Sequence, residues 1–276
     1  MKLVFNPEGH AYESIGGDFI DWVSVTGVIS VLKNPFDTKA QSVKSSKNPR
    51  SIWFGLTPEE IKGHWRYETD QSNHLGDWYH DQREQDITSF STIVRKGKEV
   101  PIFKPLEENG KRIAPSQRLV EGVYPEHFVF LKSAGITGQS DRVEVINNIV
   151  DVSDYKTSKE INFQSYRNWE GIPKMMLHPV SHLEDCEIVH YGLQLSTYMY
   201  MVLKHNPQFK PGIITIDHII FEEGERNKFN QRNLILDNDK KPILKRIERH
   251  TVPYYKEEVQ MIINEVIKDR NRFRKK

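Results

Sequence analysis

Apolar and polar residues alternate along residues 138–160 with the period of two that a half-buried β-strand shows. The pair Asn147–Asn148 interrupts this alternation, and asparagine tolerates the positive φ that a two-residue hairpin turn requires. If these two residues form the turn, the isoleucines on either side of it pair with each other, and Asp141 falls directly opposite Asp154. The segment therefore predicts a β-hairpin with two acidic side chains on one face.

Other segments show helical spacing or helix-start signals. Thr57, Pro58 and Glu60 fit the N-cap, N1 and N3 positions of a helix start, and we expect a separate helix over about residues 72–90. A strongly amphipathic helix is expected over residues 187–204. The remaining expected helices lie within residues 157–177, after a loop, and over residues 255–272.

Strand patterns occur before and after the predicted hairpin. Residues 119–131 are expected to form a strand with a break at Pro125, and residues 213–221 form a second strand by alternation. A further hairpin is expected to turn through Asn238–Asp239, whereas residues 91–118 contain three prolines and are expected to be irregular.

The composition is that of an ordinary soluble protein, with 37% hydrophobic and 28% charged residues among 276. The single cysteine, Cys186, excludes a disulfide framework, a cysteine-ligated zinc site and a four-cysteine iron–sulfur cluster. The first residues lack the apolar run of a signal peptide, and no stretch approaches 18 consecutive apolar residues, so we expect no membrane association and a reducing, cytoplasmic location.

The net charge of +1 means that any binding of nucleic acid depends on local basic patches. One such patch is Lys33–Arg50, where five lysines and arginines face one acid. The same pattern also fits a solvated surface. The chain contains no GxxxxGK[ST] phosphate-binding loop and no GxSxG nucleophile motif.

The chemistry centres on the acidic pair of the predicted hairpin. Residues opposite each other have Cβ atoms about 4.5–5.5 Å apart, and like charges there destabilise a sheet unless a cation lies between them. Lys156 projects from the same face as Asp154. Two carboxylates and a lysine suit Mg²⁺ or Mn²⁺ and hydrolysis of phosphodiesters. The flanking valines favour a buried site, although two solvated surface acids remain the alternative.

Three further positions are candidates for the same site. His80 lies four residues after Gly76, on one helix face, and Gln194 lies four residues before Tyr198. Glu126 belongs to the strand expected before the hairpin. Each position also has a simpler interpretation: a core histidine, a half-exposed polar pair and an acid on an edge strand.

Taken in order, five short segments resemble the motifs of the PD-(D/E)XK nuclease superfamily, and within it the RecB-like and phage-type exonuclease branch. They are Gly-Asp-Trp-Tyr-His (76–80), Pro-Glu-His-Phe-Val-Phe (125–130), Gly-Gln-Ser-Asp (138–141), Val-Ser-Asp-Tyr-Lys-Thr-Ser-Lys (152–159) and Gln-Leu-Ser-Thr-Tyr (194–198). The resemblance implies a restriction-endonuclease-like α/β fold, in which a central mixed β-sheet is flanked by helices. Residues 1–70 would form an N-terminal extension packed on a core of residues 71–276.

The resemblance also implies a role for each matching residue. Asp141, Asp154 and Lys156 would be the catalytic residues. The metal ligands would be His80, Asp141, Asp154 and the carbonyl of Tyr155. Supporting roles would fall to Glu126 and to Gln194 and Tyr198, which would contact the scissile region or the DNA backbone. Apart from the resemblance, the aromatic rings of Trp78 and Tyr198 are expected to stack unpaired bases, and Lys159 to contact DNA. One departure from the family pattern is Ser153, which stands where an apolar residue is common.

The sequence thus predicts a Mg²⁺-dependent, or Mn²⁺-dependent, DNA nuclease of a bacterial or phage-infected cell, acting in recombination, repair or phage DNA processing. An exonuclease acting on single- or double-stranded DNA without sequence preference is the main expectation. A structure-specific endonuclease and a catalytically idle DNA-binding or assembly protein remain alternatives. Because no motor motif is present, the protein would act alone, as a homo-oligomer, or with a helicase or annealing partner in trans.

Overall fold

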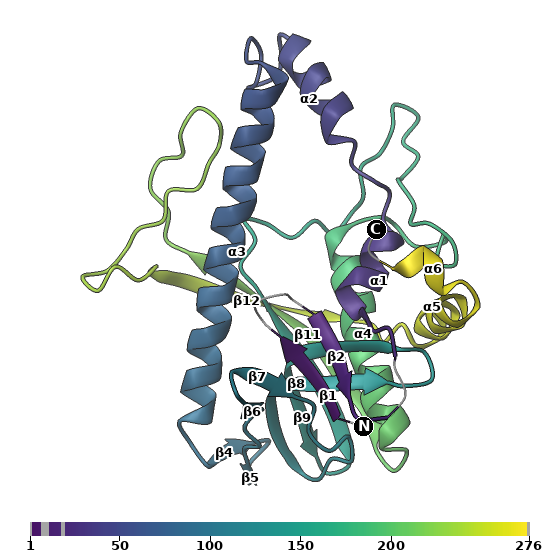
Figure 1. Ribbon diagram of the computed structural model, residues 1–276. Helices are drawn as coiled ribbons and strands as arrows, with labels where there is room; N and C mark the ends of the chain where they lie inside the picture. Colours follow the sequence, from purple (N-terminus) through teal and green to yellow (C-terminus); the bar gives the residue numbers. More distant parts are fainter. Residues whose placement is uncertain (1, 7–10, 18–19, 275–276) are drawn as a thin grey trace.

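A mixed β-sheet forms the centre of the computed structural model, which describes residues 2–6, 11–17 and 20–274 (Figure 1). Strands β10 and β11 are parallel, whereas the β8–β9, β9–β10 and β11–β12 pairs are antiparallel. The prediction of an α/β fold with a mixed sheet is therefore confirmed at this level. In spatial order the first four strands are β12 (Leu244–Val252), β11 (Lys210–Phe221), β10 (Ile149–Lys156) and β9 (Ile136–Ile146). Strand β9 pairs in addition with β8 (Gly122–Leu131) and with the short β3 (Val23–Ser24).

The predicted hairpin is strands β9 and β10. Ile146 pairs with Ile149, and the two turn asparagines have φ values of 54° and 62°, as a tight turn requires. The β9–β10 pairing ends at Arg142 and Ser153, one position before the two acids, because the first residues of β9 pair with β3 instead. Asp141 therefore lies where β9 separates from β10.

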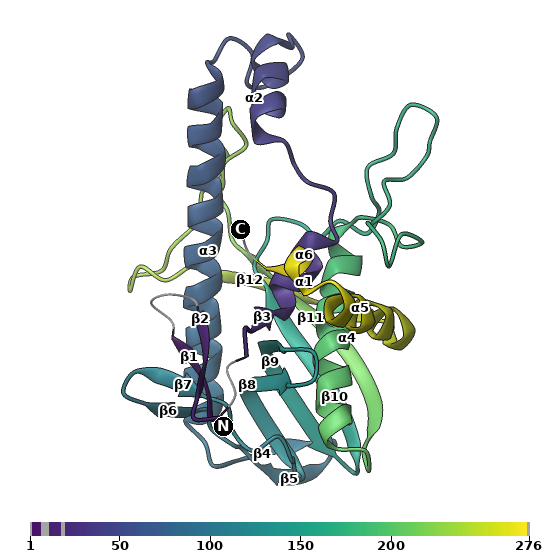
Figure 2. The same ribbon diagram turned by 45° about the vertical axis from the view of Figure 1, so that its right-hand side comes forward.

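Helices cover both faces of the sheet (Figure 2). Helix α4 (Glu187–His205) packs on one face over a core that includes Val143, Val152 and Ile214. Helix α3 (Pro58–Thr88) lies on the other face, where Tyr79 packs with Phe221. The helices beside α4 are α1 (Val25–Val31), α5 (Lys256–Lys268) and α6 (Arg270–Phe273). Within the described residues, no helix has the length and hydrophobicity needed to cross a membrane.

Helix α3 is one continuous element of 31 residues, so the prediction of two separate helices was wrong. Thr57 caps its start in the predicted capping box, with Pro58 at the first turn. The helix continues because residues 59–88 contain no proline, and the two internal glycines, Gly63 and Gly76, each cost only about 1 kcal/mol. The domain boundary expected at residue 70 falls inside this helix.

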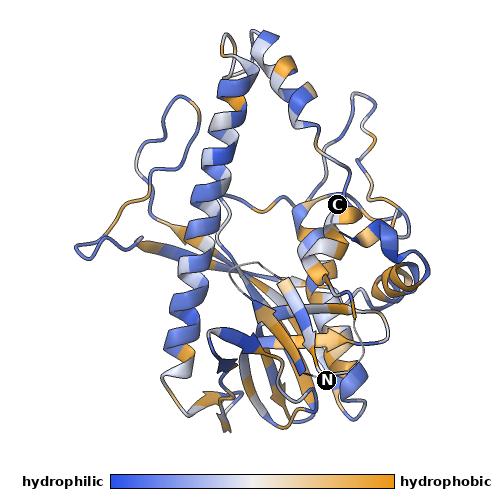
Figure 3. Ribbon diagram, in the orientation of Figure 1, coloured by the Kyte–Doolittle hydropathy of each residue, from blue (hydrophilic) through white to orange (hydrophobic). Residues whose placement is uncertain are grey.

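The first half of α3 extends beyond the sheet and is largely hydrophilic (Figure 3). Helix α2 (Thr38–Lys47) packs beside it. Trp53, in the turn between these helices, stacks on Phe229 with ring centroids 5.0 Å apart and meets Trp65 edge-on. This aromatic contact ties the α2–α3 turn to the long connection between β11 and β12.

Three further expectations differ from the structure. Residues 157–177 contain no helix: Ser165 donates its backbone N–H to Glu184, and Gly171 and Pro173 interrupt the segment. The C-terminal helix ends at Lys268, and Asp269 caps the short α6. The segment expected to be irregular, residues 91–118, forms the short strands β4 (Thr92–Arg95), β5 (Lys98–Pro101), β6 (Leu106–Glu108) and β7 (Lys111–Ile113). The N-terminal strands are β1 (Lys2–Asn6) and β2 (Ala11–Ile15).

Candidate functional site

A cavity of about 920 Å³ opens between α3, α4 and the point where β9 leaves β10. Parts of α1, β1, β2 and the β6–β7 hairpin complete its walls. Seven of the residues singled out from the sequence line it: His80, Glu126, Asp141, Asp154, Lys156, Gln194 and Tyr198. We refer to the first five of these as the cavity cluster.

The innermost contacts of the cavity cluster join three different elements. His80 on α3 places Nδ1 3.4 Å from Oδ2 of Asp141 on β9 and 3.8 Å from Oε1 of Glu126 on β8. One ligand atom from each of these three residues lies within 4.8 Å of the others, a spacing that a single metal ion can span. The structure therefore moves Glu126 from a supporting position into the centre of the candidate site.

The backbone of Glu126 explains how its side chain reaches that position. Its φ is 46°, in the left-handed region that non-glycine residues rarely adopt and that is strained by about 1–3 kcal/mol. The adjoining pairs are Pro125 with Arg142 and His127 with Ser140, so Glu126 lies across from Asp141. The strand break expected at Pro125 is thus a local distortion inside a continuous strand.

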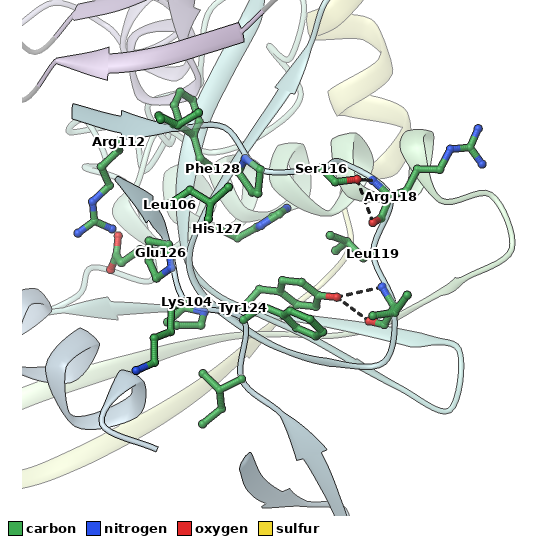
Figure 4. Close-up of a pocket in the computed structure, with 17 residues that line it drawn as sticks. Lys104, Leu106, Arg112, Ser116, Arg118, Leu119, Tyr124, Glu126, His127 and Phe128 are labelled. Carbon is green, nitrogen blue, oxygen red and sulfur yellow. Dashed lines mark hydrogen bonds between the residues drawn. The ribbon is translucent and has the colours of Figure 1, made fainter. Parts of the chain in front are cut away.

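Glu126 also borders a second, more apolar cavity of about 380 Å³ (Figure 4). Arg112 lines both cavities, and its guanidinium lies beside the Glu126 carboxylate in this view. Arg112 also forms a salt bridge with Glu84 of α3. These contacts connect the β6–β7 hairpin to the wall of the larger cavity.

Asp154 and Lys156 form the other half of the cavity cluster. Lys156 makes a close ion pair with Oδ2 of Asp154, and its ammonium lies 4.9 Å from the centre of the Tyr191 ring on α4. Among the described residues, that buried carboxylate oxygen has no well-directed hydrogen bond. A buried carboxylate oxygen without a hydrogen bond can still accept a further cationic partner beside Lys156.

The two aspartates have opposite pKa shifts although they lie in the same cavity. Burial and the neighbouring Asp141 charge raise the pKa of Asp154 to about 6. Burial also favours a raised pKa for Asp141, but the charge and hydrogen bond of His80 outweigh it and lower the pKa. The hydrogen bond from the backbone N–H of Tyr155 to Asp141, 2.6 Å long, acts in the same direction.

The partners of Asp141 shift in the corresponding directions. Burial raises the pKa of Glu126 to about 7. Burial lowers the pKa of His80, but the charge of Asp141 and hydrogen bonds to both acids outweigh it and raise the pKa to about 11. Without a metal ion, His80 therefore carries a proton at neutral pH and supplies positive charge between the two carboxylates. It would release this proton on binding an ion there.

Gln194 and Tyr198 lie one helical turn apart on α4 and face the cavity. Nε2 of Gln194 donates to the Tyr198 hydroxyl at 3.3 Å and to Oγ1 of Thr26 at 3.4 Å. Tyr198 is 2% exposed and packs against Gly138, where an added Cβ would lie 2.8 Å from Cε1 of the ring. This contact explains why glycine occupies the first position of the Gly138–Asp141 motif.

Trp78, Lys159 and Tyr155 are not among the residues that line the cavity. Trp78 is partly buried and packs against Phe221, with ring centroids 6.1 Å apart. Lys159 pairs with Glu68 and donates to the carbonyl of Asn230, which ties the loop after β10 to α3. The ring of Tyr155 faces α3 and meets His80 edge-on, with ring centroids 6.0 Å apart, while its backbone N–H donates to Asp141.

Two sets of cavity residues were missed from the sequence. Asp77, Asp81 and Glu84 line the cavity from the same stretch of α3 as His80. Tyr191 lies three residues before Gln194 and seven before Tyr198, and both intervals fit one helix face. Helical spacing measured from His80 could have found Asp77 and Glu84, and spacing from Gln194 could have found Tyr191.

Fold and site together define a mixed α/β protein with acidic, histidine and lysine side chains gathered in one cavity. No family model and no curated protein matches the chain. One similar solved structure, described as "Crystal structure of SSO0001", has a TM-score of 0.31 and 13% sequence identity, and the match covers 92% of this chain and 77% of that chain. A TM-score of this size supports no argument about fold or function.

Proposed function

We propose that this protein is a metal-dependent nuclease that hydrolyses the phosphodiester bonds of DNA in the large cavity, as an exonuclease of PD-(D/E)XK type on a restriction-endonuclease-like sheet. The observation that carries the proposal is the cavity cluster itself. His80, Glu126 and Asp141 come within the span of one metal ion, and the Asp154–Lys156 ion pair lies in the same cavity. These residues come from four separate elements, and their sequence order matches the family motifs.

The donor set of the cavity cluster fits a hard divalent cation. The cavity cluster contributes three carboxylates, two of them with pKa values raised by burial, and Oδ2 of Asp154 has no well-directed hydrogen bond among the described residues. Crowded buried carboxylates of this kind are stabilised by a cation, and carboxylate oxygens suit Mg²⁺ or Mn²⁺. His80, Glu126, Asp141 and Asp154 would hold the ion, which would supply activation of the attacking water and stabilisation of charge on the phosphate.

The protein's own residues would bind and orient the substrate. The ion pair with Asp154 holds Lys156 in the cavity. Burial lowers the pKa of Lys156, but the charge of Asp154 outweighs this effect and raises the pKa overall, so the ammonium remains charged. A fixed ammonium beside the phosphate would stabilise negative charge as the bond breaks. Gln194 and Tyr198 offer polar groups on the opposite wall for contacts with the DNA backbone.

Basic residues of the Lys33–Arg50 patch would bind the DNA backbone at this cavity and outside it. Lys33 lines the cavity, and the lysines of the basic patch on α2, Lys39, Lys44 and Lys47, are exposed. Phosphate contacts of this kind carry no base information, which supports a substrate without sequence preference. This placement also fits a structure-specific endonuclease, so the substrate form must be decided by the reaction itself.

The test is degradation of end-labelled single- and double-stranded DNA with Mg²⁺, beside covalently closed circles and a chelator control. We expect loss of label that needs Mg²⁺, a free end and Asp154, tested with Asp154→Asn. The matched control is Asp239→Asn, an exposed aspartate in the β11–β12 connection. Cutting of closed circles would show an endonuclease. DNA binding without cleavage by the folded protein, with either Mg²⁺ or Mn²⁺, would refute the proposed activity.

A further inference from the structure

A second group of metal-binding side chains lies outside the cavity, on strands β11 and β12. His218, Glu248 and His250 each offer one ligand atom, and these atoms lie within 4.8 Å of one another. We refer to these three residues as the edge cluster. His218 pairs with Glu248 across the antiparallel β11–β12 ladder, and His250 follows Glu248 on the same face of β12.

The hydrogen bond of His218 is the one that a metal-binding histidine uses. Its Nε2 lies 2.8 Å from the carbonyl oxygen of Ser158, and a carbonyl oxygen can only accept. Nε2 therefore carries the proton, and Nδ1 keeps a lone pair in the neutral ring. Metal-bound histidines donate their second ring N–H to a carbonyl in this way, which fixes the ring orientation.

His250 provides the second, independent observation. Within the described residues its Nε2 is buried and has no hydrogen-bond partner. The carboxylate oxygen Oε2 of Glu248 lies 4.0 Å away, which is too far for a hydrogen bond, while Arg246 binds the other oxygen, Oε1, at 2.7 Å. Phe163 meets the His250 ring edge-on, with centroids 5.0 Å apart, and shields this side of the cluster.

We propose that the edge cluster binds a transition-metal ion of the Zn²⁺ class through two imidazoles and one carboxylate. Two nitrogen donors and one oxygen donor suit Zn²⁺ better than Mg²⁺, which prefers oxygen ligands and keeps its water. Nε2 of His250 and Oε2 of Glu248 are too far apart to bond to each other, and an ion between them would bind both atoms. This proposal does not depend on nuclease activity.

The ion would have a structural effect on the segment next to the cavity. His218 pairs with Lys156 in the parallel β10–β11 ladder and holds Ser158 in the loop that follows β10. A metal ion on His218 would therefore fix β12, β11 and the first residues of this loop relative to one another. Zn²⁺ would raise the temperature of unfolding because it binds the folded state alone.

The experiment is calorimetric titration of Zn²⁺ into the full chain, without an affinity tag, in the presence of saturating Mg²⁺. We expect one equivalent of Zn²⁺ to bind and to raise Tm. His250→Ala should lower the affinity by more than the roughly 10–100-fold that loss of an outer-shell partner costs. Glu248→Gln changes an exposed carboxylate with little change of shape and should weaken binding as well. Circular dichroism of each variant checks its fold.

His182→Ala is the matched control, since His182 also lies beside a glutamate, with Nε2 3.2 Å from Glu258, but has no second histidine in the same group. Its Zn²⁺ binding should equal that of the unchanged protein. Unchanged binding in both His250→Ala and Glu248→Gln would overturn the proposal. So would loss of the same Zn²⁺ equivalent in Asp141→Asn, since the ion would then belong to the cavity cluster.

Discussion

The cavity cluster and the edge cluster are built from the same residue types on the same sheet, but they lie in different surroundings. The cavity cluster forms where β9 separates from β10, and helix α3 supplies its histidine. The edge cluster forms on two strands that remain paired, and its histidines come from the strands themselves. One cluster opens into a cavity of about 920 Å³, whereas neither histidine of the other lines that cavity.

This difference assigns different chemistry to the two clusters. Separation of two strands exposes carboxylates to a space that can admit a substrate, while burial still raises the pKa of Asp154 and Glu126. On the paired strands, the edge cluster instead presents two histidines and one glutamate with ligand atoms within 4.8 Å of one another. The comparison therefore predicts a catalytic, oxygen-rich centre at the first position and a nitrogen-rich structural centre at the second.

Substitution of one residue in each cluster should produce the largest contrast. Asp154→Asn should lower Mg²⁺-dependent DNA cleavage by at least about 10²-fold, because it removes a ligand and the partner that positions Lys156. His250→Ala should leave the cleavage rate with Mg²⁺ close to that of the unchanged protein. Initial rates under identical conditions measure both effects. An equal loss in the two variants would show that the clusters do not have separate roles.

The pH dependence of Mg²⁺ binding should identify the carboxyls of the cavity cluster. The pKa of Asp154, about 6, exceeds its ordinary value of 3.8, so the folded state holds this proton more tightly than the unfolded state. This contribution to stability is complete below pH 3.8 and is lost as the pH rises through 6. Bound Mg²⁺ requires the carboxylate, so the rise in Tm that Mg²⁺ causes should be larger at pH 7.5 than at pH 5.

For each ligand that must lose a proton, the apparent affinity for Mg²⁺ falls by up to about tenfold for every unit by which the pH drops below the pKa of that ligand. The protons of Asp154 and Glu126, with pKa values of about 6 and 7, should steepen this dependence between pH 5 and 7.5, in addition to the His80 proton that is released over the whole range. Calorimetry at a series of pH values measures this change of slope. Glu126→Gln should remove the upper part of this dependence and leave the lower part. A pH profile that is the same in Glu126→Gln and the unchanged protein would place Glu126 outside the metal site.

Local signals explain which parts of this arrangement the sequence could predict. The two asparagines of the hairpin turn and the capping box at Thr57 act over three or four residues, and both occur as predicted. The alternation along residues 138–160 correctly placed Asp141 and Asp154 near each other. Spacing on one helix face likewise brought Gln194 and Tyr198 to the cavity.

Long-range contacts explain what the sequence could not predict. The sequence placed Glu126 near Asp141 on a neighbouring strand, but its left-handed backbone is not a conformation that its residue type favours and could not be predicted. The face that Trp78 presents depends on how α3 lies on the sheet, and its partner Phe221 is more than a hundred residues away in the sequence. His218 and His250 meet only through the register of β11 with β12.

A substitution at Gly138 tests whether packing by α4 supports the cavity cluster without supporting the edge cluster. In Gly138→Ala the new Cβ would lie 2.8 Å from the ring of Tyr198, which is 2% exposed and has little space to move. We expect the free energy of unfolding to fall by about 1–3 kcal/mol, as for other overpacked core positions. Denaturant titration measures the change, and Gly63→Ala, with no atom within 4 Å of its Cβ, serves as the control.

Gly63 lies inside α3, so its replacement by alanine should stabilise the helix by up to about 1 kcal/mol. Gly138→Ala should also lower Mg²⁺ affinity, because Asp141 is three residues further along the same strand, but Zn²⁺ binding at the edge cluster should not change. If both metal affinities fall together, the substitution disturbs the whole sheet, and the two clusters are coupled through it. If neither falls, the contact between Gly138 and Tyr198 contributes to stability but does not position Asp141.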